Sequence, residues 1–281
     1  MKTHIWIGML ASLLGLPAAA ADDPALTLDW EDHRLTISGD ALPGGSMEIL
    51  YIEAYCRPGS TERPWDETVI GHETELLERS ADGARLVLRD TLDDGVVVTH
   101  TITAADDEID FRLIAHNPTD TASQAHWAQP CVRVDLFTGT TRDDARALAP
   151  AYVRQSFIFI DDKLAMLPTE PWATEALYTP GQVYCPSHVD RDDVNPRPLS
   201  SLVPSNGLIG CFSADRRQIA ATAWEPYQEL FQGVIACLHS DYRIAGLDAG
   251  ETKSIRGKLY LVDADVAQLL ERYEADFPEQ R

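Results

Sequence analysis

Residues 85–116 read RLVLRDTLDDGVVVTHTITAADDEIDFRLIAH, and this stretch decides the fold. It divides into three segments of β type, Arg85–Leu92, Val96–Ala104 and Glu108–His116, and Asp94-Gly95 joins the first two. An Asp-Gly pair between apolar segments is a strong signal for a hairpin turn. The last segment alternates apolar and polar residues, as a strand does when it buries one face. The stretch therefore predicts an antiparallel meander with one face in the core.

Similar segments extend in both directions from this meander. They are short and are separated by turn-forming Gly, Pro, Asn and Asp residues. Further strands are expected at 25–30, 35–38, 47–55, 75–79, 126–136, 157–160, 164–167, 208–213, 218–224, 234–240 and 252–262. So many short strands predict a mainly β protein, built as a large antiparallel β-sandwich.

One helix is expected at the C-terminal end of the chain, at about 263–277. Its apolar residues recur at helical spacing, with Asp263 as the expected N-cap and Pro278 as the stop. No internal repeat or linker divides the preceding strands, so residues 22–281 are expected to form a single domain.

The region 168–204 contains seven prolines. Proline does not fit a regular helix or a central strand, so an irregular loop is expected here. The loop also carries Trp172, Tyr178 and Tyr184, which argue for order. Long ordered loops are usually functional, and this one is expected to be so.

Residues 1–21 have the pattern of a secretory signal peptide. Lys2 precedes the apolar run Ile5–Leu16, Pro17 breaks that run, and Ala19–Ala21 offer a cleavage site. The apolar run is shorter than the roughly 20 residues that cross a bilayer, and no later stretch is long and apolar enough to do so. We therefore expect a secreted or periplasmic protein without a membrane span.

The chain is strongly acidic, with 23 Lys and Arg residues against 45 Asp and Glu and a formal charge of −22. A polyanion repels other polyanions, so nucleic acid and anionic membrane surfaces are excluded as partners. The charge is compatible with cations and with neutral ligands such as sugars.

The five cysteines are an odd number and include no C-x-x-C pair. The chain also has no P-loop, H-E-x-x-H motif or dinucleotide fingerprint, so no metal and no cofactor are expected. Cys131, Cys211 and Cys237 lie in apolar strand-like segments. They are expected to be small buried side chains, the alternative being a disulfide.

His126, Trp127 and Gln129 stand together at a strand entrance. A Trp ring stacks on the C–H face of a pyranose, while His and Gln side chains bond its hydroxyl groups. The alternative is a Trp in the core and a His at the surface.

Glu225 lies between aromatic residues, which raise the pKa of a carboxyl group and suit a general base. Its alternative is a solvated Glu at a strand end.

Residues 185–193 contain His188, Arg191 and three aspartates. This composition suits an acid–base pair or, as a weaker interpretation, a hard cation. The alternative is a solvated acidic loop braced by Arg191 and Arg197.

His239 is a single strand histidine, a type that is more often structural than functional, and it is kept as a further candidate.

Tyr51, Glu53, Tyr55 and Arg57 alternate along one expected strand. Alternate residues of a strand share a face, so these four predict a ligand-binding wall. The alternative is a sheet face with an internal Glu53–Arg57 pair.

Short motifs resemble those of the galactose mutarotase-like group, which has the supersandwich fold of aldose epimerases and their relatives. The matching stretches are EIDFRLIAHNPT at 108–119, His126-Trp127, Glu-Pro-Tyr-Gln at 225–228 and Leu-Asp-Ala-Gly-Glu-Thr at 247–252. The resemblance implies that His126 protonates the ring oxygen of a sugar and Glu225 removes the anomeric proton. His188 is a loose match to a second histidine of that group.

The sequence thus predicts an exported protein that interacts with a saccharide or polysaccharide. Acid–base chemistry by His and Glu would make it epimerase-like or lyase-like, and the alternative is a non-catalytic glycan-binding or envelope-associated protein. Arg57, Arg191 and Arg197 favour an anionic sugar. Because this fold hosts many functions, both hypotheses stay open.

Overall fold

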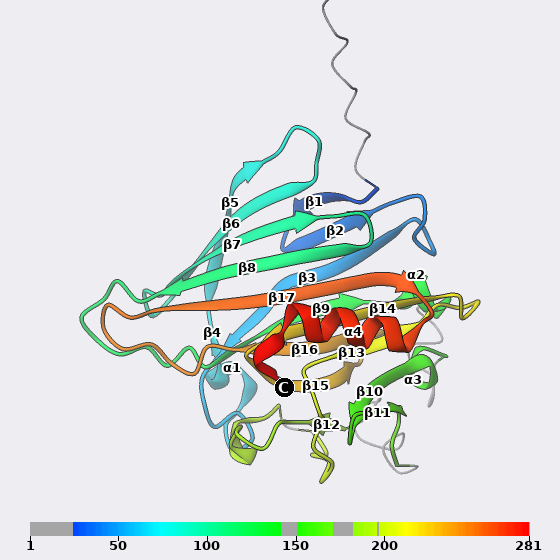
Figure 1. The fold of residues 1–281 in the computed structure, drawn as a ribbon. Coiled ribbons are helices and arrows are strands. Elements are labelled where there is room, and N and C mark those ends of the chain that lie inside the picture. The colour runs from blue at the N-terminus through cyan, green and yellow to red at the C-terminus, as the bar shows by residue number, and fades with distance from the viewer. Residues whose placement is uncertain (1–24, 142–150, 171–181, 196, 281) are drawn as a thin grey trace, which may run out of the picture.

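The computed structural model describes residues 25–141, 151–170, 182–195 and 197–280. Two antiparallel sheets pack face to face, and the C-terminal helix lies across the outer face of one of them (Figure 1). The predicted mainly β sandwich with one C-terminal helix is therefore confirmed. The expected signal peptide, at residues 1–21, lies outside the described residues.

The nine-stranded sheet is built around the predicted meander. Its strands follow the order β11-β10-β13-β14-β17-β8-β7-β6-β5. The meander provides β6 (Arg85–Leu92), β7 (Val97–Ala104) and β8 (Glu108–His116). The other strands are β5 (His72–Arg79), β10 (Ser156–Ile160), β11 (Lys163–Met166), β13 (Ile209–Phe212), β14 (Gln218–Glu225) and β17 (Thr252–Asp263).

The eight-stranded sheet follows the order β1-β2-β3-β9-β16-β15-β12, with β4 paired to β3. Its strands are β1 (Thr27–Glu31), β2 (Arg34–Ser38), β3 (Ser46–Cys56), β4 (Val69–Ile70), β9 (Trp127–Arg133), β12 (Val183–Tyr184), β15 (Tyr227–Gly233) and β16 (Cys237–Arg243). Segments far apart in sequence therefore lie side by side in this sheet, notably β3, β9 and β16.

The main core fills the space between the two sheets. Trp224 of β14 lies 4.9 Å from Tyr242 of β16 and 5.1 Å from Phe111 of β8, measured between ring centroids. A polar network is buried in the same layer, where the Tyr51 hydroxyl lies 2.8 Å from His100 Nδ1. His100 Nε2 in turn lies 3.1 Å from Asp90 Oδ2. Because Tyr51 belongs to β3, and His100 and Asp90 to β7 and β6, this network ties the sheets together.

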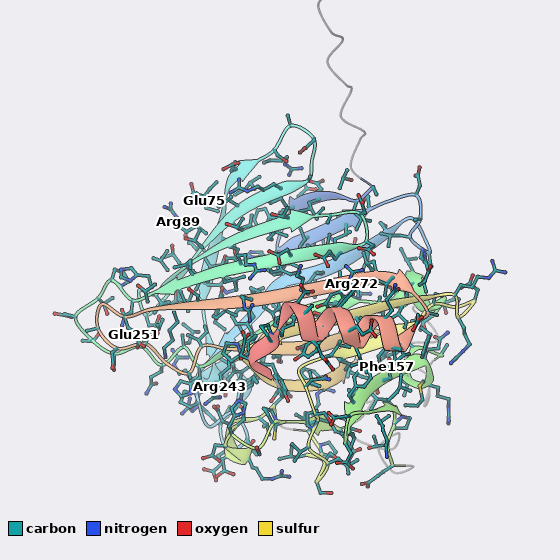
Figure 2. The ribbon with its side chains drawn as sticks, viewed as in Figure 1. Glu75, Arg89, Phe157, Arg243, Glu251 and Arg272 are labelled. Carbon is teal, nitrogen blue, oxygen red and sulfur yellow. The ribbon has the colours of Figure 1, made fainter. Side chains whose placement is uncertain are left out.

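The C-terminal helix α4 spans Val266–Asp276 and begins later than predicted. The expected N-cap, Asp263, is the last residue of β17, and Asp265 caps the helix instead by accepting from the amides of Ala267 and Gln268. Leu269 and Tyr273 face the outer side of the nine-stranded sheet. There they join a second apolar cluster that includes Phe157, which is labelled in Figure 2.

Several local predictions are corrected by the structure. The strand expected at 126–136 ends at Arg133, and a short helix, α2 (Asp135–Thr138), follows it. Two further short helices, α1 (Trp65–Thr68) and α3 (Ala151–Gln155), were not predicted. The strand expected at 234–240 begins at Cys237, because 234–236 turn the chain back from β15, which sequence reasoning missed.

The proline-rich region is irregular where the structure describes it, as predicted. It contributes only the two-residue edge strand β12 and one 3-10 turn at Arg191–Asp193. Trp172 and Tyr178 lie outside the described residues. Among the residues that are described, no helix is both long and apolar enough to cross a membrane.

Candidate functional site

A cavity of about 390 Å³ lies on the face of the eight-stranded sheet that points away from the core. The alternation of β16 sets this face. Leu238 and Tyr242 enter the core between the sheets, so Cys237, His239 and Asp241 lie on the opposite side. The lining of the cavity includes Glu53, Trp65, Gln129, Cys131, Asn195, Arg197, Phe231, Cys237 and His239.

His239 lies at the centre of this lining, and its ring is fixed from several directions. Its Nδ1 lies 3.2 Å from Asp241 Oδ1, and its Nε2 lies 3.4 Å from Cys237 Sγ. The ring stacks on Phe231 with 4.1 Å between centroids and 10° between planes. Glu53 Oε2, on the cavity side, lies 4.0 Å from Nε2. One edge of the imidazole is therefore anchored in protein and the other meets a thiol and a carboxylate.

Burial and neighbouring charges set the protonation of this cluster. Burial opposes the charged form of His239, but the negative charge on Cys237 and the hydrogen bond to Asp241 outweigh it and raise its pKa. Burial also raises the pKa of Asp241, against the hydrogen bond from His239. For Cys237, the hydrogen bond from Cys131 and the charge on His239 outweigh burial and lower the thiol pKa. The pKa shifts of Cys237 and His239 thus depend on each other, because each is caused in part by the charge of the other.

A second buried carboxylate, Glu229 of β15, lies behind this cluster. Its Oε2 accepts a hydrogen bond of 2.8 Å from the backbone N–H of Asn195, a residue that lines the cavity. Burial, followed by the charge on Asp241, raises the pKa of Glu229 well above its ordinary value. Glu229 therefore connects the floor of the site to the loop that covers it.

The structure brings three of the predicted site residues together in the cavity. They are Glu53, Gln129 and His239, which come from β3, β9 and β16. Gln129 is buried and faces Asp241. His239, kept from the sequence as a further candidate, therefore lines the cavity.

The predicted shared face of Tyr51, Glu53, Tyr55 and Arg57 is wrong. The pairing of β3 with β9 is irregular between Leu50 and Ala54, which breaks the alternation there. The Tyr55 hydroxyl donates to Asp90 Oδ2 at 2.5 Å inside the core, whereas Glu53 is exposed in the cavity. Arg57 donates to the carbonyl of Val69 at 2.5 Å, beside β4.

Trp127 is fully buried and packs against Ala54 and Cys56, so it does not offer a stacking face to the cavity. This is the core alternative considered from the sequence. Trp65 lies at the cavity instead, 43% exposed, with its ring centroid 6.3 Å from that of Trp127.

His126 lies just before β9, and Arg191 lies in the 3-10 turn Arg191–Asp193. His126 Nδ1 is 3.5 Å from Asp193 Oδ2, and Arg243, labelled in Figure 2, places its Nη1 3.2 Å from the same oxygen. Arg191 donates to the carbonyl of Ser200 at 3.2 Å. Asp193 is thus buried and held by an ion pair with Arg243, whereas the alternative considered from the sequence was a solvated loop braced by Arg191 and Arg197.

Glu225 and His188 are placed away from the cavity lining. Glu225 ends β14 in the nine-stranded sheet, opposite Arg256 of β17. Burial raises its pKa, while the charge on Arg256 opposes the shift. The His188 ring lies 6.4 Å from that of Tyr227, and burial followed by the charge on Arg243 lowers its pKa. The structure therefore pairs His239 with Glu53 in the cavity, whereas His126, just before β9, and Glu225, at the end of β14, lie outside the cavity lining.

Sequence reasoning missed Asp241, Glu229 and the two thiols as site residues. The signal for most of them was present in Cys237-Leu238-His239-Ser240-Asp241, where three chemically active side chains alternate along one strand. All five cysteines are free and buried, which confirms the expected burial of Cys131, Cys211 and Cys237. However, Cys131 and Cys237 line the cavity. The donor atoms of Cys131, Cys237 and His239 lie within 4.8 Å of one another, a grouping suited to a metal ion.

Comparisons with known proteins found no matching family model and no matching curated protein. Among solved structures, the chain is similar to an α-mannosidase from Enterococcus faecalis at 10% identity, with a TM-score of 0.49, over 97% of this chain and 32% of that one. It is also similar to a candidate aldose 1-epimerase from Escherichia coli K12, at 11% identity and a TM-score of 0.43, over 84% and 98% of the two chains. A galactose mutarotase-like protein from Lactobacillus casei matches at 7% identity and a TM-score of 0.43, over 84% and 99%. These similarities describe the course of the chain and not the chemistry of its side chains.

Proposed function

We propose that this chain is an exported saccharide-binding protein of the galactose mutarotase-like group, and that its sugar site is the cavity on the eight-stranded sheet. The observation that carries the proposal is the exposed indole of Trp65 beside the polar lining of Glu53, Gln129 and Asn195. An aromatic face for the C–H side of a sugar, with hydrogen-bonding groups around it, is the combination that a pyranose requires.

The size and composition of the cavity support a small ligand. Its volume of about 390 Å³ falls within the ~300–1,000 Å³ of small-molecule sites. Arg197 also lines the cavity and brings a positive charge to it. We propose an anionic sugar, such as a uronate, as the preferred ligand over its neutral counterpart.

Binding is proposed here ahead of catalysis. The acid–base pair expected from the sequence, His126 and Glu225, does not line the cavity. Epimerase-like or lyase-like chemistry therefore remains the second candidate function, favoured by the histidine and the carboxylate that do meet there, His239 and Glu53, 4.0 Å apart.

The direct test is a glycan array followed by calorimetry on the mature chain, with matched uronate and neutral sugars. Trp65→Ala is expected to weaken binding at least 10-fold, because it removes the exposed stacking face. Leu77→Ala is the matched control, since Leu77 is similarly exposed (45%) but lies on β5 of the other sheet. His126→Ala and Glu225→Gln are expected to retain binding.

Turnover is assayed on the same samples by reducing-sugar and unsaturated-product assays. If the wild type shows turnover and Glu225→Gln loses it, the protein is an enzyme that uses the acid–base pair expected from the sequence, His126 and Glu225. Absence of binding to every glycan would overturn the proposal. N-terminal sequencing of the protein recovered from an exporting host tests cleavage after Ala21.

A further inference from the structure

We propose that Cys131, Cys237 and His239 form a binding site for a thiophilic divalent metal ion of the zinc type, in the floor of the cavity. The proposal shares the cavity with the proposed sugar site but does not depend on sugar binding. It also goes beyond the expectation from sequence, which found no metal-binding spacing because the ligands come from two strands.

The donor atoms have the spacing of a tetrahedral site. The two thiol sulfurs and His239 Nε2 lie within 4.8 Å of one another, and Cys237 Sγ is 3.4 Å from His239 Nε2. Zinc takes sulfur ligands at about 2.3 Å and nitrogen ligands at about 2.0–2.1 Å, which places the two ligand atoms about 3.5 Å apart in a tetrahedron. The pair therefore needs little rearrangement to share one ion.

The scaffold beneath the donors is rigid. Residue 131 lies on β9 and residues 237 and 239 on β16, and these strands are direct neighbours in the sheet, with Cys237 opposite Arg133 and Leu238 opposite Val132. His239 and Cys237 share a face because they are two residues apart. Sites on neighbouring strands hold their ligands more firmly than sites on loops.

The outer contacts of His239 also fit a metal ligand. Its Nδ1 is 3.2 Å from Asp241 Oδ1, which directs Nε2 toward the thiols. Histidine ligands commonly donate their second nitrogen to a carboxylate, which fixes the tautomer and the ring orientation. Gln129 faces Asp241 in turn, so the orienting carboxylate is itself supported.

Gly233 of β15 has no side chain, so Cys237 and His239 pack directly against its backbone. A Cβ at this position would collide with Cys237 Sγ and approach within 3.0 Å of His239 Nε2. A fourth ligand is available from the cavity side, where Glu53 Oε2 lies 4.0 Å from Nε2. With Glu53, the site would have two sulfur ligands, one nitrogen and one oxygen, which is a complete tetrahedral set. Alternatively, an added ligand would occupy the fourth position in place of Glu53.

The proposal is tested by titrating the reduced mature chain with Co²⁺, a spectroscopic probe for zinc sites, and with Zn²⁺ by calorimetry. We expect one ion per chain and a thiolate-to-cobalt charge-transfer band. Cys237→Ala and Cys131→Ala should abolish that band, while Cys185→Ala, which changes a buried cysteine outside the cavity lining, should retain it. Asp241→Asn should weaken the affinity about 10–100-fold, the range known for such orienting groups.

Gly233→Ala keeps every ligand and is expected to prevent loading, because the added Cβ would displace Cys237 Sγ. Circular dichroism and thermal melting of each metal-free variant separate loss of the site from loss of the fold. The proposal is overturned by a reduced, folded wild type that shows no thiolate band. It is equally overturned if loading persists in Cys237→Ala. The purified chain could also carry a Cys131–Cys237 disulfide. If the chain still binds no metal after this disulfide is reduced, the proposal is overturned and the pair has a redox role instead. Sugar binding by the metal-free chain, measured in parallel, keeps this result separate from the proposed function.

Discussion

The molecule contains two buried histidines that each lie beside a buried aspartate, and they differ in what surrounds them. His100 lies between the sheets, where Nδ1 meets the Tyr51 hydroxyl at 2.8 Å and Nε2 meets Asp90 at 3.1 Å. His239 uses Nδ1 for Asp241, but its Nε2 points to a thiol at the edge of a cavity. A histidine enclosed between the sheets is structural, whereas one whose ring edge faces a cavity is available for ligands.

Breaking the His100–Asp90 pair, the closed pair between the sheets, should reduce the free energy of unfolding much more than breaking the His239–Asp241 pair. His100→Ala leaves Asp90, which is 1% exposed, without its buried hydrogen-bonding partner, and we expect the free energy of unfolding to fall by about 3–5 kcal/mol. His239→Ala opens a space continuous with the cavity, which water can enter, so its cost should be smaller. Urea denaturation of both variants measures the difference, and equal costs would contradict the comparison.

Arg89→Ala is the control for that measurement. Arg89 precedes Asp90 on β6 but points outward, where it pairs with Glu75 at 2.5 Å, and both residues are labelled at the sheet surface in Figure 2. Exposed ion pairs contribute about 0–1 kcal/mol, so this variant should unfold close to the wild type.

The His100–Asp90 pair should also affect how the stability of the protein changes at low pH. Burial raises the pKa of Asp90, but the charge and hydrogen bond of His100 and the hydrogen bond from Tyr55 outweigh it and lower the pKa to about 2. A carboxyl whose pKa is lower in the folded state stabilises the protein above its unfolded pKa, and that contribution disappears as the pH falls through the folded value. From an ordinary 3.8 to about 2, the contribution is about 2 kcal/mol.

Asp90→Asn should therefore flatten the loss of stability between about pH 5 and pH 2. Urea unfolding of wild type and variant across this range measures the slope. An unchanged slope would show that Asp90 is not the group that His100 holds ionised.

Most of the fold followed from local pattern, because hairpin turns and alternation act within a few residues. The meander of 85–116 was predicted nearly to the residue. The errors fall where tertiary contacts override pattern, as at β3, whose irregular pairing with β9 rotates Glu53 and Tyr55 to opposite sides. β15 was missed because its residues, Tyr227–Gly233, are buried on both faces and do not alternate.

The candidate site was less predictable because its parts come from strands that only the sheet order brings together. Glu53, Gln129 and His239 were each singled out, but no pattern within one segment indicated that they meet. The sequence also could not distinguish His239 from His100, since each is a single histidine in a predicted strand and the aspartate partner of each lies at a different place in the chain. Asp241 is two residues from His239, whereas Asp90 reaches His100 across neighbouring strands.

Apart from the Arg89→Ala control, the smallest expected effect is that of Tyr55→Phe, and it separates the two regions most cleanly. The Tyr55 hydroxyl donates to Asp90 Oδ2 at 2.5 Å and accepts from Tyr242 at 3.2 Å, while its ring packs in the core. Phenylalanine keeps the ring and removes the hydroxyl, and Asp90 retains His100, so the free energy of unfolding should fall by about 1 kcal/mol. Because Tyr55 points away from the cavity, sugar binding and cobalt loading should be unchanged. A loss of sugar binding or of cobalt loading would mean that the buried network of Asp90, His100 and Tyr55 positions the residues of the cavity. The backbone of β3 could transmit this effect, since it carries both Tyr55 and Glu53.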